Sequence, residues 1–169
     1  MPSKLNSGRG RVSAWFSWHR LGVCLTLLIA SWPLHTAAEV SSLSFVQADY
    51  ASVREAVIEA IEGEGLVVGH VMAFNDMLVR TGPGIGKGAS PFVQAEIIQF
   101  CSSQIAWQLI EEAPGQIALC PLSIALSERR QPKGLIVISW RTPTTSTPGQ
   151  EQAGALLRRL QQRIQREVR

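Results

Sequence analysis

Residues 95–121 read AEIIQFCSSQIAWQLIEEAPGQIALCP, and this stretch decides the fold that the sequence predicts. Its hydrophobic pattern predicts a strand over residues 93–100, a helix over residues 103–112 and a second strand from Ile117 onward. We therefore expect a strand, a helix and a returning strand in direct succession, with the rest of the chain arranged around this unit.

The segments on either side supply further strands and helices. Upstream, the pattern predicts a strand, a helix that Asp49 or Ser52 can cap, a Val-rich strand and a short helix capped by Asn75. Downstream, two alternating stretches predict a β-hairpin. Helices separated from a hairpin favour an α+β fold, here a small two-layer sandwich with a mainly antiparallel sheet. The upstream elements cover residues 41–46, 52–61, 66–74 and 75–81, and the hairpin covers residues 120–127 and 135–140.

The first 38 residues have the features of a secretory signal peptide. Four basic residues and no acid precede an apolar run over residues 21–34, and Thr36-Ala37-Ala38 supplies small residues for cleavage before Glu39. The apolar run is shorter than the roughly 20 residues of a spanning helix. We expect a periplasmic or secreted protein, and an uncleaved N-terminal anchor is the alternative.

The charge of the chain argues against a nucleic-acid partner. Residues 39–169 contain twelve Lys and Arg and thirteen Asp and Glu, which gives a net charge of −1. An acidic domain with a short basic tail is a poor match to a nucleic-acid-binding surface.

The C-terminal part of the chain is predicted to be a separate helix. The predicted organisation is a signal peptide over residues 1–38, a domain over 39–141, a Pro, Thr and Ser linker over 142–150 and a basic amphipathic helix over 151–169. The apolar positions of this C-terminal helix repeat at helical spacing, which suits packing on the domain or on a partner helix. A solvated tail is the alternative. These positions are Ala153, Leu157, Leu160, Ile164 and Val168.

Cys101 and Cys120 lie at the two ends of the central helix segment. They are the only cysteines after residue 38, and an exported protein meets an oxidising compartment. Because the helix and the returning strand cover similar distances in opposite directions, the two cysteines can meet and form a structural disulfide. The alternative is a reactive thiol, since Cys101 precedes a helix N-terminus that favours a thiolate.

A second group of candidate residues lies around the Val-rich strand. His70 shares a face of this strand with Met72, and Met77 lies just beyond it. Together with a cysteine they form a soft ligand set suited to copper(I) or haem. The preferred interpretation is a histidine buried among core methionines. The candidate ligand or redox site comprises His70, Met72, Asp76, Arg80, Cys101 and Cys120.

Five short motifs together resemble a known family. They are a strand containing His70, then Asp76-Met77-Leu78, Arg80-Thr81-Gly82, Phe100-Cys101-Ser102 and Cys120-Pro121. In this order they resemble a branch of the domain of unknown function 302 family, over about residues 45–143. The resemblance implies the α+β fold and no established activity.

These observations favour an exported binding module rather than an enzyme. We expect it to bind a small ligand or a protein partner, with a disulfide between Cys101 and Cys120. A homodimer is compatible with the sequence, and no cofactor is identified. The alternative function is a periplasmic thiol-redox or soft-metal protein, with copper or haem, that acts through Cys101, Cys120 and His70.

Overall fold

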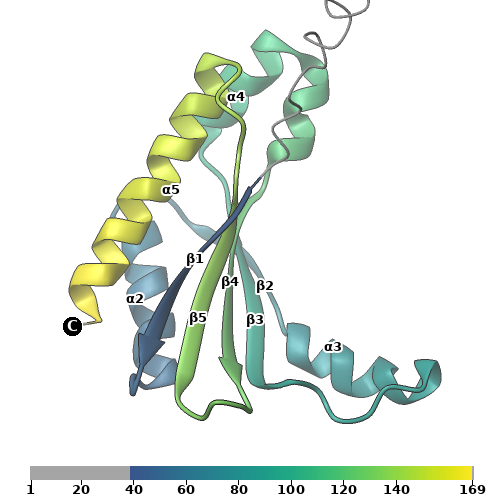
Figure 1. Ribbon diagram of the computed structural model, residues 1–169. Coiled ribbons are helices and arrows are strands. Elements are labelled where there is room, and N and C mark those ends of the chain that lie inside the picture. Colours follow the sequence, from purple (N-terminus) through teal and green to yellow (C-terminus); the bar gives the residue numbers. More distant parts are fainter. Residues whose placement is uncertain (1–38, 169) are drawn as a thin grey trace, which may run out of the picture. The chain divides into compact units, whose positions relative to one another are not determined.

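The computed structural model describes residues 39–168, which form a five-stranded antiparallel sheet with helices (Figure 1). The strand order is β1-β5-β4-β3-β2, and every neighbouring pair is antiparallel. The predicted α+β class is therefore confirmed, whereas the predicted signal peptide lies outside the described residues. In chain order the elements are β1 (Glu39–Val46), α2 (Tyr50–Glu62), β2 (Val68–Met72), α3 (Phe74–Thr81), η1 (Gly82–Ile85), β3 (Phe92–Phe100), α4 (Ser103–Glu112), η2 (Pro114–Leu119), β4 (Leu122–Arg129), β5 (Leu135–Thr142) and α5 (Pro148–Glu167).

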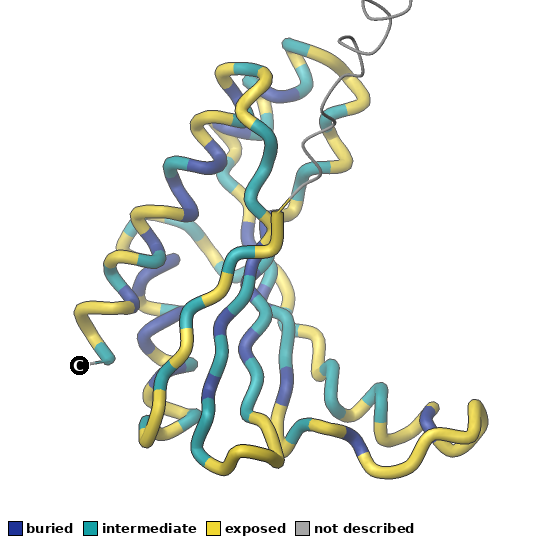
Figure 2. The backbone as a smooth tube through the Cα atoms, in the orientation of Figure 1, coloured by how far each residue is buried: buried dark blue, intermediate teal, exposed yellow. Residues whose placement is uncertain are grey.

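One face of the sheet packs against α2 and α5, which lie on the same side of it in Figure 1. The strands alternate between buried and more exposed residues, as expected for a sheet with one buried face (Figure 2). The buried residues of β3, β4 and β5 meet the apolar sides of the helices and form one hydrophobic core. Its fully buried members include Val53, Val57, Ile61, Ile98, Phe100, Leu109, Ile124, Leu126, Ile136, Ile138, Leu160 and Ile164.

The opposite face of the sheet is open to a much greater degree. On β4 the residues Ser123, Ala125 and Ser127 alternate with the core residues and are half-buried. On β1 the corresponding residues, such as Ser42 and Ser44, are exposed. The sheet therefore has one face in the core and one face available to solvent or a partner.

The returning strand that was predicted from Ile117 is wrong. Residues Pro114–Leu119 form the 3₁₀ helix η2 instead, and β4 begins only at Leu122. Pro114 fixes the backbone at the first position of η2, directly after Ala113 has left the helix in an extended conformation. This local constraint overrides the apolar pattern of the segment.

The Asn75 cap predicted for α3 is also wrong, whereas the prediction that Asp49 or Ser52 caps α2 is confirmed for Asp49. Asp49 caps α2, because its carboxylate accepts a hydrogen bond from the Ser52 N–H at 2.9 Å. Ser102 caps α4 in the same way. The N-cap of α3 is Ala73, and Asn75 lies within the first turn, where its amide donates to the Val93 carbonyl at 3.2 Å.

The C-terminal helix α5 packs on the domain. Leu160 and Ile164 are fully buried, and Ala153 and Leu157 are almost so. The solvated-tail alternative is therefore wrong. Since β5 extends to Thr142 and α5 begins at Pro148, the connection between them is shorter than the predicted linker. Within residues 39–168, no helix combines the length and the apolar character needed to cross a membrane.

Candidate functional site

A polar cleft opens where β2 ends. Because β2 stops at Met72, opposite Ile97, the preceding part of β3 has no strand partner on that side. After β2 the chain continues into α3, and the first turn of α2 lies beside the part of β3 that has no strand partner. The resulting cleft has a volume of about 360 Å³, within the usual range of ligand pockets. Its polar lining residues are Tyr50, Arg54, Asn75, Asp76, Gln94 and Glu96.

Glu96 is the centre of the polar cluster in this cleft. Its side chain is only 13% exposed, and its Oε1 atom lies 2.7 Å from Arg54 Nε. The Tyr50 hydroxyl donates to the same oxygen at 3.3 Å. Burial, followed by the charge of Glu96 and the hydrogen bond to it, raises the pKa of Tyr50 far above its ordinary value. Tyr50 therefore stays protonated and acts as a hydrogen-bond donor.

The other wall of the cleft carries acceptors. Asp76 lies in the first turn of α3 and is exposed. Asn75 uses its amide N–H on Val93, while its Oδ1 atom is buried and has no hydrogen-bond partner among the described residues. A buried acceptor without a partner costs free energy. With the charge of Arg54 paired to Glu96, the Asp76 carboxylate is the charge in the lining that has no ionic partner among the described residues.

Two other clefts of similar size lie along α5. One is lined by residues that include Glu64 and Arg159, which form an ion pair at 2.9 Å. The other is lined by residues that include Trp140 and Arg158. Neither brings several partly buried polar groups together as the cleft at Glu96 does, so this cleft is the best candidate for a ligand site.

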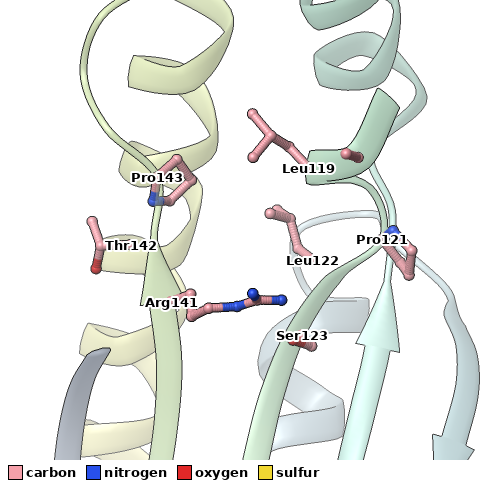
Figure 3. A pocket seen from close by; sticks show the side chains of 8 residues that line it. Leu119, Pro121, Leu122, Ser123, Arg141, Thr142 and Pro143 are labelled. Carbon is pink, nitrogen blue, oxygen red and sulfur yellow. The ribbon is translucent and has the colours of Figure 1, made fainter. Parts of the chain in front are cut away.

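A smaller pocket lies between the start of β4 and the end of β5 (Figure 3). Its volume of about 110 Å³ is below that of ordinary ligand pockets. The Arg141 side chain extends from β5 towards Leu122 and Ser123, and Leu119 and Pro143 lie at the other end. Its lining is mainly apolar, with a single cation across the opening.

The two cysteines meet beside α4. Cys101 lies between the end of β3 and the cap residue of α4, and Cys120 lies between η2 and β4. Both are free thiols in this structure, with Cys101 exposed and Cys120 half-buried. Burial raises the pKa of Cys120 to about 11, and a hydrogen bond with Cys101 adds to this effect. The two thiols are therefore neighbours that are not bonded.

His70 and Met72 are far more exposed than predicted. Both lie on the open face of the edge strand β2, where His70 is paired with Gln99 and Met72 with Ile97. Met72 is 37% exposed, so the interpretation as a histidine among core methionines is wrong. Arg80 is exposed in the last turn of α3. Residues 39–168 contain no group of three or more His, Cys, Asp or Glu side chains placed to hold a metal ion.

Of the predicted candidates, the structure brings together the two cysteines and places Asp76 in the polar cleft. The sequence analysis did not identify Tyr50, Arg54 and Glu96, which also line this cleft. Glu96 did carry a signal, because it shares the inward-facing side of β3 with Ile98 and Phe100. An acid at such a position needs a partner, and Arg54 on the amphipathic helix could have supplied it.

Comparisons with known proteins identify a family and a fold. The family model described as "Domain of unknown function DUF302" matches residues 44–168. The match therefore extends beyond the resemblance seen in the sequence and includes α5. A search of the curated proteins found no match. The crystal structure of an uncharacterized conserved DUF302 protein from Bacillus stearothermophilus is similar, with a TM-score of 0.59 and 18% identity over 79% of this chain and 100% of that chain.

Proposed function

The chain belongs to the DUF302 family, and we propose that it is an exported binding module that holds a small ammonium-bearing ligand in the polar cleft. One observation carries the binding role. Three segments converge on a cleft of ligand size, and a partly buried ion pair forms one of its walls. Export is supported by the basic, apolar and small-residue regions that precede Glu39.

The chemistry of the cleft selects the kind of ligand. Arg54 is the one cation among the lining residues, and its Nε atom already binds Glu96. Asp76 offers an exposed carboxylate in the lining, and the side-chain amide oxygen of Gln94 is a further acceptor there. An ammonium group supplies both a positive charge and N–H donors, and therefore complements these acceptors.

The location of binding can be tested by NMR with n-butylammonium chloride as the probe. We expect chemical-shift changes in the backbone amides of Tyr50, Arg54, Asp76 and Glu96, with no change along α4. Tetramethylammonium chloride, which has no N–H donor, is the matched control and should bind more weakly. Equal responses to both salts, or changes confined to another cleft, would contradict the proposal.

We also propose that Cys101 and Cys120 form a disulfide in the exported protein. The two cysteines lie near each other but not at disulfide distance, so the bond requires a movement that brings the two sulfur atoms together. A disulfide would tie the end of β3 to the start of β4 and enclose α4 and η2 in a short covalent loop. The oxidising compartment favours this state.

A thiol-redox role is the second candidate, and the unequal exposure of the two cysteines favours it. In this role the exposed Cys101 thiolate attacks a substrate disulfide and releases one thiol. Cys120 then attacks the Cys101 sulfur and releases the second thiol, so the substrate is reduced and the pair is oxidised. The raised pKa of Cys120 opposes the second step, because its burial disfavours the thiolate that has to attack. We therefore favour the structural disulfide.

The other alternative, binding of a soft metal ion, would use the sulfur atoms of the same two cysteines. Two neighbouring thiols can bind copper(I), since thiolates are soft ligands. His70 lies on the exposed face of β2, and this position gives no support for its participation. Titration of the reduced protein with copper(I) against a competing chelator tests this role, and loss of binding in Cys101→Ser, with no effect of His70→Ala, is the expected pattern.

A further inference from the structure

Residues 73–91 form an arm between the end of β2 and the start of β3. The arm consists of α3, η1 and a glycine-rich loop, and Figure 1 shows it extending away from the strands. No residue of α3 is buried, and within residues 73–91 the buried positions are Gly82 and Ser90 alone (Figure 2). The arm therefore exposes most of its length to its surroundings.

The turn between β4 and β5 lies beside the base of this arm. Phe92, the first residue of β3, is paired with Arg129, the last residue of β4. The Arg130 N–H donates to the Pro91 carbonyl at 3.0 Å, and the Arg130 Nε–H donates to the Ser90 carbonyl at 2.8 Å. The arm and the turn are therefore held together at one end of the sheet.

These two segments carry positive charge without any negative charge. Residues 77–91 of the arm and 129–134 of the turn contain five basic residues and no acidic one, and we call the two segments the basic end. All five basic residues are exposed, and none of them forms an ion pair among the described residues. They are Arg80, Lys87, Arg129, Arg130 and Lys133.

The neighbouring acids are engaged elsewhere. Asp49 caps α2, and Asp76 lines the polar cleft. Glu128 points, like Leu126, to the core face of the sheet, whereas the next residue, Arg129, points to the opposite face. Positive and negative groups are thus separated, so the basic end attracts anionic partners.

Exposed apolar side chains accompany these cations. Ile85 is 72% exposed and lies two residues before Lys87, and Val79 is 55% exposed next to Arg80. An apolar side chain on a projecting loop can enter the boundary between lipid headgroups and acyl chains while a neighbouring cation binds the headgroup phosphates. An acidic polypeptide would pair with the cations but would give Ile85 no apolar surroundings, so it accounts for only half of this pattern.

We propose that the basic end binds the surface of a membrane that contains anionic phospholipids, with Ile85 and Val79 at the lipid interface. The binding is peripheral and reversible, because a few apolar side chains and cations hold a protein much less firmly than a spanning helix does. The inference is independent of the ligand cleft and of the thiols, since no residue that lines the cleft and neither cysteine lies in the basic end.

The test is flotation with vesicles of the protein that begins at Glu39. This protein keeps the whole core, and it lacks residues 21–34, which are apolar and would bind lipid on their own. One set of vesicles contains phosphatidylcholine alone, and the other contains equal parts of phosphatidylcholine and phosphatidylglycerol. At millimolar lipid we expect binding to the anionic vesicles alone, and this binding should weaken when the salt is raised from about 0.1 M to about 0.5 M.

Two substitutions separate the contribution of charge from that of apolar contact. Lys87→Gln should lower the partition coefficient about fivefold, and Arg158→Gln, at an exposed cation of α5, should leave it unchanged. Ile85→Gln should lower it at least about threefold, because apolar surface no longer enters the interface. Ile117→Gln is its matched control, since Ile117 is 67% exposed on η2, beyond the other end of β4. Thermal unfolding checks that all four variants fold.

The proposal would be overturned by an absence of binding to the anionic vesicles or by equal binding to both kinds of vesicle. Losses in the control variants as large as those in Lys87→Gln and Ile85→Gln would also overturn it. Binding to polyglutamate that Ile85→Gln leaves unchanged, without binding to vesicles, would overturn it as well and would assign an acidic polypeptide as the partner of the basic end.

Discussion

Arg54 Nε lies 2.7 Å from Glu96 Oε1 and joins the first half of α2 to β3. The Glu96 side chain is 13% exposed and that of Arg54 is 39% exposed, so the pair is partly screened by solvent. The pair holds the wall of the polar cleft in place and also prevents an uncompensated charge on the buried side of the sheet.

Replacing Arg54 by Met should lower the free energy of unfolding by about 1–2 kcal/mol. The loss is smaller than for a fully buried pair because water screens the arginine. Urea unfolding measures it, and Arg158→Met, at an exposed position of α5, is the control. Adding Glu96→Gln to Arg54→Met should recover part of the loss. Unchanged stability in the single variant would show that Glu96 does not need this partner.

Truncation of Leu160 should test the packing of α5. Leu160 is fully buried, so Leu160→Ala leaves a cavity and should cost about 2–4 kcal/mol. Gln162→Ala, on the exposed side of the same helix, should cost less than about 0.5 kcal/mol. Both values come from denaturant unfolding of the protein that begins at Glu39. Equal effects of the two substitutions would mean that α5 is not docked.

Glu112 should make stability depend on pH on the acid side. The pKa of the Glu112 carboxyl lies below its ordinary value of 4.5, and the largest cause is a hydrogen bond from Thr147. Hydrogen bonds from Gln108 and Gly149 lower this pKa further, whereas desolvation opposes the shift. Because the pKa of Glu112 is lower in the folded than in the unfolded protein, its charged form stabilises the fold above pH 4.5. This stabilisation is lost as the pH falls through the pKa that Glu112 has in the folded protein. Glu112→Gln should therefore be less stable than wild type near neutral pH and should approach it in acid.

The measurement is the urea midpoint as a function of pH, with Glu111→Gln as the control. Glu112 also accepts a hydrogen bond from the Gly149 N–H at 2.8 Å, at the start of α5. The neighbouring Glu111 is exposed and has no such role among the described residues. A difference between wild type and Glu112→Gln that is the same at every pH would contradict the assignment.

The cysteine pair should be oxidised when the protein is isolated from the exported fraction. Mass spectrometry without reductant should find no alkylatable thiol in residues 39–169. Reduction, or a Cys101→Ser and Cys120→Ser double variant, should cost about 3 kcal/mol, since the bond closes a short loop. Two thiols that react fully with iodoacetamide would exclude the structural disulfide, and fast reaction at Cys101 alone would favour the redox role.

Local signals explain which elements could be predicted from the sequence. The helix Ser103–Glu112 was predicted with the correct bounds because its apolar spacing lies within one short segment. The 3₁₀ helix Pro114–Leu119 was not predicted, because its proline overrides an apolar pattern that otherwise favours a strand. The two cysteines lie near each other as predicted but not at disulfide distance, and the chain returns through η2 rather than along a strand.

The cleft could not be predicted in the same way. Tyr50 and Glu96 are 46 residues apart, and their contact depends on how α2 crosses the end of the sheet. That crossing is set by the whole core, including α5. Asp76 alone was identified, from a short motif, and its neighbours in the cleft follow only from the register at which β2 ends beside β3.

The affinity of the cleft for n-butylammonium, in wild type and in Asp76→Asn, tests the proposed ligand site most directly. The substitution keeps the shape of the side chain and removes its charge, and Asp76 is exposed enough to leave the fold intact. Calorimetry should show binding that is weakened about fivefold, which corresponds to roughly 1 kcal/mol for one exposed charge. Glu111→Gln should bind as wild type does. Equal affinity in all three proteins, or no heat of binding to any of them, would contradict a ligand site in this cleft.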